Sequence, residues 1–110
     1  MAELQDVTDA SFEREILQKG TVALVDFWGD HCPACRQISP ILHDLAAGYA
    51  GRVKIVKMHA AENMATSSRF GVRAMPTVLA FRDGEVRGQL VGARRKSDFE
   101  GLIEGLLAGH

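Results

Sequence analysis

The chain has 110 residues, of which 46% are hydrophobic and 25% charged, and its formal net charge at pH 7 is −1. This length favours a single domain over residues 1–110, with one modest hydrophobic core. A nearly neutral chain has no general electrostatic attraction for nucleic acid or for an anionic membrane, so neither is expected as a partner.

Apolar periodicity, turn residues and capping signals divide the chain into alternating strands and helices. In chain order the expected strands and helices are an edge strand over Leu4–Val7, a helix over Asp9–Gln18, a strand over Val22–Trp28, a helix over Pro33–Tyr49, a strand over Val53–Met58, a helix over Glu62–Arg69, strands over Val78–Phe81 and Glu85–Val91, and a helix from Ser97 to Leu107.

Local signals mark several of these boundaries. Asp83-Gly84 is a strong hairpin turn signal between two strands. Ser97 and Glu100 have the spacing of a capping box for the last helix. Pro40, inside the second helix, removes a backbone hydrogen bond and is expected to kink it. The residues expected on the buried helix faces are Phe12, Ile16, Leu17, Ile38, Ile41, Leu42, Leu45, Phe99, Leu102, Ile103, Leu106 and Leu107.

The order of elements predicts an α/β fold. Strands that alternate with helices in the first half of the chain pair in parallel through helical crossovers, and the hairpin adds an antiparallel pair. A mixed sheet with helices on both faces follows.

The only two cysteines, Cys32 and Cys35, lie where the strand over Val22–Trp28 passes into the next helix. Cys32 is at or just before the first helical turn, where unpaired backbone N–H groups and the helix dipole favour an anion. This position is expected to lower the pKa of the Cys32 thiol and to make it the attacking thiol.

A metal site is the alternative for this pair. Zinc and iron–sulfur sites need about four ligands, and beyond the two thiols only His31 and His59 are plausible candidates. Because no second cysteine pair completes such a site, redox chemistry is favoured and no metal is expected.

Asp26 interrupts the apolar strand just before the cysteine pair. A buried carboxyl resists ionisation, so the pKa of Asp26 is expected to be raised. A carboxyl group of this kind can accept the proton of the Cys35 thiol. Alternatively, Asp26 lies exposed at a strand end or caps a helix. Lys57 on the neighbouring strand is the group expected to tune Asp26, unless it is an ordinary solvated lysine.

With these motifs in place, the chain resembles the thioredoxin family over essentially its whole length. The residues that carry the resemblance are Asp26, Phe27-Trp28, Cys32 and Cys35, Pro40, Lys57, Met75-Pro76-Thr77, Asp83-Gly84 and Val91-Gly92-Ala93. The resemblance implies the thioredoxin fold, a central mixed sheet of about five strands flanked by four helices. It implies dithiol–disulfide exchange as the chemistry, with Cys32 as nucleophile and Cys35 as resolving thiol.

The same resemblance implies a substrate-binding surface. Pro76 matches the family's cis-proline, although cis bonds are only about 5–6% of X–Pro bonds in general and a trans bond is the alternative. Met75 would then offer its backbone N–H and C=O to an extended substrate. Trp28 and Gly92 would pack around the sulfurs, with Gly92 permitting close approach of a partner backbone. Trp28 is also compatible with a place in the core.

The residues around the cysteines depart from the family pattern, which has Trp-Cys-Gly-Pro-Cys. Here His31 replaces the aromatic residue, and it supplies either a titratable positive charge or only a solvated side chain. The order Pro33-Ala34 leaves Ala34 with a backbone N–H that is expected to donate to the Cys32 thiolate. A stabilised thiolate makes the pair somewhat more oxidising than a typical thioredoxin.

Two further departures are Ala61, where the family usually has an acid, and Ala74, where it usually has a glycine. His43 and His110 are expected to be surface residues without a role.

The resemblance implies a monomeric protein-disulfide reductase with no bound cofactor. A flavin-dependent thioredoxin reductase using NADPH would recharge it, and its clients would be disulfide-containing proteins. The chain begins without the basic start and apolar block of a signal peptide, so a cytoplasmic location is expected. The alternatives are a specialised disulfide oxidant or isomerase, and a thioredoxin-fold module that binds one partner through Trp28, Met75 and Gly92.

Overall fold

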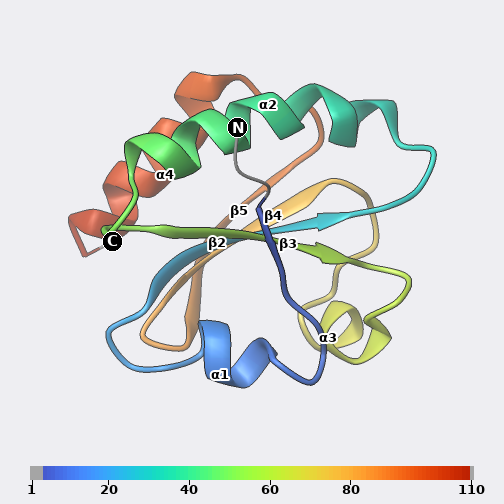
Figure 1. Cartoon of the computed structure of the whole chain (residues 1–110), viewed down its shortest axis with the longest axis horizontal. Coiled ribbons are helices and arrows are strands. Elements are labelled where there is room, and N and C mark those ends of the chain that lie inside the picture. Colours follow the sequence, from blue (N-terminus) through green and yellow to red (C-terminus); the bar gives the residue numbers. More distant parts are fainter. Residues whose placement is uncertain (1–3, 110) are drawn as a thin grey trace.

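A computed structural model describes residues 4–109. Figure 1 shows a central sheet between two layers of helices. The strands are β1 (Gln5–Asp6), β2 (Val22–Trp28), β3 (Lys54–His59), β4 (Thr77–Arg82) and β5 (Glu85–Val91). The helices are α1 (Phe12–Ile16), α2 (Pro33–Gly48), α3 (Met64–Arg69) and α4 (Lys96–Leu107).

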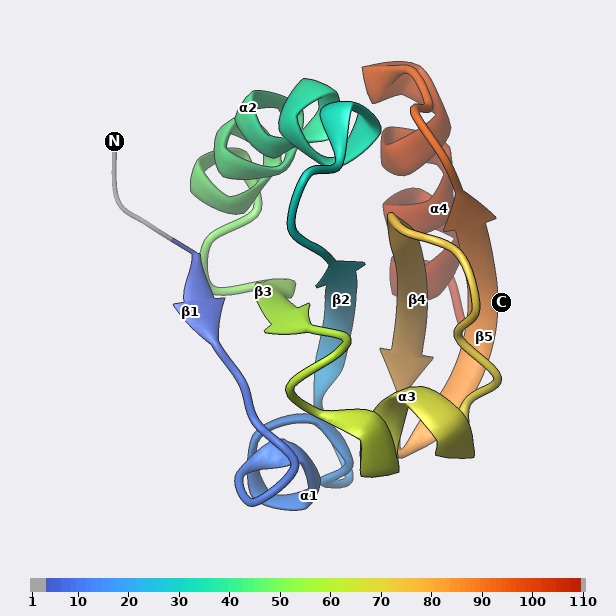
Figure 2. The ribbon, with the colours of Figure 1, turned by 90° about the vertical axis from the view of Figure 1, so that its right-hand side faces the viewer.

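The sheet has the strand order β1-β3-β2-β4-β5, which Figure 2 shows across the molecule. β3 pairs in parallel with β1 and β2, whereas β4 pairs antiparallel with β2 and β5. Thr77 at the start of β4 is paired with Phe27 on one side and with Val91 on the other. The C-terminal ends of β2 and β5 therefore lie at the same end of the sheet as the segment that precedes β4.

Helices cover both faces of the sheet, α2 and α4 on one and α1 and α3 on the other (Figure 1). Side chains of β2 alternate between the two cores, as the strand geometry requires. Leu24 packs with residues of α2 and α4, and Val25 and Phe27 pack with residues of α1. By the same alternation, Asp26 is directed to the face that α2 covers.

The predicted mixed α/β fold is confirmed, and the predicted helix faces are largely buried. Of those side chains, Leu17, Ile41, Leu102 and Leu107 are only partly buried, and the other eight belong to the core. α1 is shorter than predicted at both ends. α2 continues without interruption through Pro40.

The predicted capping box of the last helix is wrong. The helix begins one residue earlier than predicted, at Lys96, with Arg95 as its N-cap. The carboxylate of Asp98 accepts a hydrogen bond from the backbone N–H of Arg95 at 3.1 Å. Ser97 therefore lies inside the first turn, where its hydroxyl is not at the capping position.

Candidate functional site

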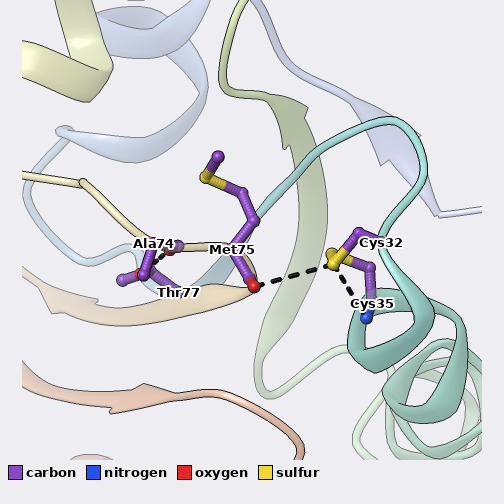
Figure 3. Close-up of a disulfide and its surroundings, with 5 residues drawn as sticks. All are labelled: Cys32, Cys35, Ala74, Met75 and Thr77. Carbon is purple, nitrogen blue, oxygen red and sulfur yellow. Dashed lines mark hydrogen bonds between the residues drawn. A yellow bond between two sulfur atoms is a disulfide. The ribbon is translucent and has the colours of Figure 1, made fainter.

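The cysteine pair lies at the junction between β2 and α2, with Cys32 as the N-cap and Pro33 in the first helical turn. A disulfide joins Cys32 to Cys35, and their Cα atoms are 5.3 Å apart. The backbone N–H of Cys35 donates to Cys32 Sγ at 3.2 Å (Figure 3). The sulfur of Cys32 therefore takes the place of the oxygen acceptor that usually caps a helix N-terminus.

The two sulfur-bearing residues differ in their access to solvent. Cys32 is half-buried, whereas Cys35 is buried, with 8% of its surface exposed. An incoming disulfide can therefore approach Cys32 but not Cys35.

The segment before β4 faces the disulfide. The Met75–Pro76 peptide bond is cis, which confirms the predicted cis-proline. The carbonyl oxygen of Met75 lies 3.6 Å from Cys32 Sγ (Figure 3). Thr77 Oγ1 donates to the carbonyl of Ala74 at 2.6 Å, and the backbone N–H of Gly92 donates to the carbonyl of Pro76 at 2.9 Å. These two bonds hold the segment beside the sulfur.

Asp26 is buried, with 6% of its surface exposed, and lines one cavity together with Cys32 and Cys35. Burial raises the pKa of the Asp26 carboxyl to about 7, while the nearby positive charge of Lys57 acts in the opposite direction. Its Oδ1 atom is buried without a hydrogen-bond partner among the described residues. The alternative of an exposed or helix-capping Asp26 is wrong, and Lys57 lies beside it on β3, in register.

A cavity of about 370 Å³ connects these groups. The residues that line it are Leu4, Asp26, Trp28, Gly29, Asp30, His31, Cys32, Cys35, Arg36, Ser39, His43 and Lys57. His43, predicted to be a surface residue without a role, is half-buried and lines this cavity, and its Nδ1 lies 2.7 Å from the carbonyl of Ser39. Cys35, Ser39 and His43 follow each other at intervals of four, a spacing that places them on one helix face and could have revealed this from the sequence.

Trp28 is half-buried at the end of β2, and its ring contacts the side chains of His59 and Lys57. The His59 ring meets it edge-on, with centroids 4.6 Å apart, and Lys57 Nζ lies 5.7 Å from the centroid of its ring. The indole Nε1 is buried without a hydrogen-bond partner among residues 4–109. His59, which also contacts Asp30 at 3.1 Å, was not predicted to contact Trp28. A lone histidine at a strand end gives no signal of such a contact.

Comparison with known proteins agrees with this geometry. The family model for thioredoxin matches residues 3–105. The chain belongs to the thioredoxin family. It is 41% identical over 103 residues to the thioredoxin of Haemophilus influenzae, covering 94% of this chain and 96% of the relative. The thioredoxin of Pseudomonas aeruginosa is 39% identical over 99 residues, covering 90% of this chain and 92% of the relative. That of Allochromatium vinosum is 42% identical over 98 residues, covering 89% and 92%.

Membership of the thioredoxin family makes this chain a thiol–disulfide oxidoreductase and a protein-disulfide reductase. Thioredoxins bind no cofactor, and NADPH typically supplies their electrons through thioredoxin reductase. Within residues 4–109 the structure contains no cluster of three or more histidine, cysteine or acidic residues that could hold a metal ion.

The residues in which this thioredoxin departs from the family pattern surround the disulfide. His31 is exposed and adopts a φ of 54°, an uncommon conformation for a residue other than glycine. The hydrogen bond that Cys32 Sγ accepts in this oxidised form comes from Cys35, and the predicted donation by Ala34 to a thiolate remains a prediction. Gly92 has a φ of 88°, and apart from Gly92 itself and its two chain neighbours no residue comes within 4 Å of the position that a Cβ would take there.

Two remaining sequence-based predictions concern the chain ends and the membrane. His110 lies outside the described residues. No helix over residues 4–109 combines the length and apolar character needed to cross a bilayer.

Proposed function

We propose that this thioredoxin reduces client disulfides with Cys32 as the attacking thiolate and Cys35 as the resolving thiol. The observation that carries this assignment is the unequal exposure of the two residues at the start of α2. Cys32 is accessible and sits at the helix N-terminus, whereas Cys35 is buried with 8% exposure. The backbone N–H groups of the first turn stabilise a negative charge on the Cys32 sulfur.

Exchange proceeds in two steps that transfer two electrons to the client. The Cys32 thiolate attacks one client sulfur, forming a mixed disulfide and releasing the other client sulfur as a thiolate. Cys35, once deprotonated, attacks Cys32 Sγ, which forms the Cys32–Cys35 disulfide and releases the second client sulfur. The released thiolates take up protons, so the client gains two electrons and two protons.

Asp26 is the proton acceptor that we assign to the second step. Its carboxyl is buried and lines the same cavity as both cysteines. A pKa of about 7 leaves a substantial ionised fraction at neutral pH, so the group can accept a proton as well as hold one. Lys57, in register with it, favours the ionised form.

The client segment binds beside the cis-proline in this proposal. Met75 is 39% exposed and its carbonyl lies 3.6 Å from Cys32 Sγ, so an extended client backbone added there places its disulfide against the attacking sulfur. Open space over Gly92 leaves room for that backbone. Trp28 and His31 line the cavity that reaches both cysteines.

We further propose that the redox potential is less negative than that of a typical thioredoxin. In the thiolate form the Ala34 N–H, which the usual proline order lacks, donates to Cys32 Sγ in addition to the bond from Cys35. Each charge-assisted hydrogen bond contributes about 1.5–3 kcal/mol. Stabilising the thiolate stabilises the reduced form and shifts the equilibrium toward it.

In a reducing compartment such as the cytoplasm, the protein would work as a monomer recharged by a flavin-dependent thioredoxin reductase with NADPH. Its partners are then that reductase and the client proteins. The family membership supports this assignment.

Insulin reduction by dithiothreitol, followed as turbidity, tests the assignment of the thiols. Cys32→Ser is expected to lower the rate to the uncatalysed background, whereas Cys35→Ser is expected to accumulate the mixed disulfide, visible by mass spectrometry. A Cys32→Ser variant as active as the wild type would contradict the proposal. Consumption of NADPH in the presence of purified thioredoxin reductase tests the assigned electron donor separately.

A further inference from the structure

Three exposed arginines belong to segments that meet at the disulfide end of the sheet, and the exchange chemistry uses none of them. Arg73 precedes the cis-proline segment by two residues, Arg94 follows Gly92 by two, and Arg36 lies in the first turn of α2. Arg36 lines the cavity beside both cysteines. Arg36, Arg73 and Arg94 together are called the arginine rim.

The sheet register brings the segments that carry these arginines to one end of the sheet. Phe27, Thr77 and Val91 form a row across β2, β4 and β5, so the segments that leave or enter these strands are neighbours (Figure 2). The hydrogen bond from Gly92 N–H to the Pro76 carbonyl joins two of these segments directly. Arg94 Nε donates to the carbonyl of Val91 at 3.0 Å, which holds its guanidinium over the end of β5.

The charges of the arginine rim are not neutralised within residues 4–109. None of the three forms an ion pair with a carboxylate there, whereas the two basic residues that directly follow Arg94 do. Arg95 pairs with Asp98, and Lys96 pairs with Asp44. Asp30, two residues after the end of β2, has its Oδ2 3.1 Å from His59 Nε2. The rim therefore remains positive although the whole chain has a net charge of −1.

The segments that carry Arg73 and Arg94 also expose a short apolar strip, Met75 and Val91. Met75 and Val91 are each 39% exposed, unusual for large apolar side chains in this chain, and Met75 packs over Gly29. A strip of this kind binds the apolar part of an extended segment, and the charges beside it select what flanks that part.

We propose that the arginine rim makes this thioredoxin selective for client disulfides flanked by acidic residues. The inference rests on the proposed function, because it places the client strand along Met75. Arg73 and Arg94 would then contact client carboxylates on the two sides of the reacting disulfide, with Arg36 beside Cys32. Arginine suits this task because its planar guanidinium binds carboxylates in a bidentate manner.

The test uses three disulfide peptides that differ only in having glutamate, serine or lysine next to the cysteines. Fully reduced protein is mixed with each oxidised peptide, and the second-order rate constant of protein oxidation is measured at low ionic strength. Each value is divided by the rate of the same peptide with dithiothreitol, which removes differences in the intrinsic reactivity of the peptides.

The wild type is expected to react about fivefold faster with the glutamate peptide than with the serine peptide, the scale of one or two exposed ion pairs. This ratio is expected to approach one near 1 M salt, where the screening length is about 3 Å. Arg73→Gln/Arg94→Gln should lose most of the ratio, and Arg73→Glu/Arg94→Glu should prefer the lysine peptide. The control Arg14→Gln/Arg87→Gln removes the same number of positive charges, one from α1 and one from the first half of β5. It should keep the wild-type ratio of the glutamate-peptide rate to the serine-peptide rate.

Equal rates of the wild type with all three peptides would overturn the inference, as would an unchanged preference in Arg73→Gln/Arg94→Gln. Both results leave exchange itself intact. Absence of reaction with the serine peptide would instead contradict the proposed function, so the two failures are distinct.

Discussion

The two faces of the sheet are packed differently. On the face of α1, the rings of Phe12, Phe70 and Phe81 form a cluster with centroids 5.2–5.6 Å apart. Under the start of α2, the sheet instead places a buried carboxyl beside a cavity of about 370 Å³. The two buried side-chain polar atoms found without a partner in residues 4–109, Asp26 Oδ1 and Trp28 Nε1, both belong to the cavity lining.

This difference separates stability from chemistry within one small fold. The aromatic cluster buries large apolar side chains, which is the main source of folding free energy. The cavity side includes groups that reduce stability, and such groups are expected where a reaction requires them. Substitutions in the aromatic cluster and at the buried carboxyl of Asp26 should therefore change stability with opposite signs.

Truncating the aromatic cluster is expected to give the largest effect. Phe81 is fully buried, so Phe81→Ala should lower the free energy of unfolding by about 3–5 kcal/mol through lost burial and a residual cavity. Urea denaturation at pH 7 measures this. The exchange rate per folded molecule should stay unchanged, and a loss of catalytic rate in the still-folded variant would contradict the separation of the two faces.

Neutralising the buried acid is expected to act in the other direction. The Asp26 carboxyl has an ordinary pKa of 3.8 and one of about 7 in the folded protein. The folded state therefore holds the proton more tightly, and the wild type loses stability as the pH rises from about 4 through 7. Asp26→Asn does not titrate there, so it should be more stable than the wild type by up to about 4 kcal/mol above pH 8 and show no such advantage below pH 4.

Denaturation of Asp26→Asn and wild type across pH 3–9 checks this difference. A constant stability difference across that range would contradict the assigned pKa. The same variant should slow the resolution of the mixed disulfide at neutral pH, which single-turnover kinetics measure.

Restoring the usual residue order between the cysteines is expected to have a smaller effect. Pro33→Gly/Ala34→Pro removes the N–H at position 34, so the double variant should be more reducing than the wild type by about 30–60 mV, the equivalent of one charge-assisted hydrogen bond. Equilibration with a glutathione series measures both potentials. A wild-type value at or below that of the double variant would contradict the role given to Ala34.

Parts of the fold differ in how well the sequence predicts them. The apolar runs around Val25 and Phe81 and the turn at Asp83-Gly84 were sufficient to predict the sheet, because each is a strong local signal. The start of α4 was not predictable from spacing, since both Ser97–Glu100 and Arg95–Asp98 have residues three apart and only tertiary context decides which pair forms the cap.

At the site, the cysteines, Asp26 and Pro76 could be predicted because each is an unusual residue for its position or matches a family motif. The contact of His59 with Trp28 could not, because it depends on the register in which β3 pairs with β2. The orphaned polar atoms likewise follow from packing rather than from local sequence.

The pH dependence of Cys32 alkylation in the reduced protein tests the central claim most directly. With limiting iodoacetamide and Cys35→Ser as the background, the rate reports the thiolate fraction of Cys32 alone. The helix N-terminus and the backbone N–H of residue 35 both favour the Cys32 thiolate. We therefore expect a titration midpoint well below about 8.5, the value of an ordinary cysteine. A midpoint at or above that value would show an unperturbed thiol and contradict the proposed mechanism.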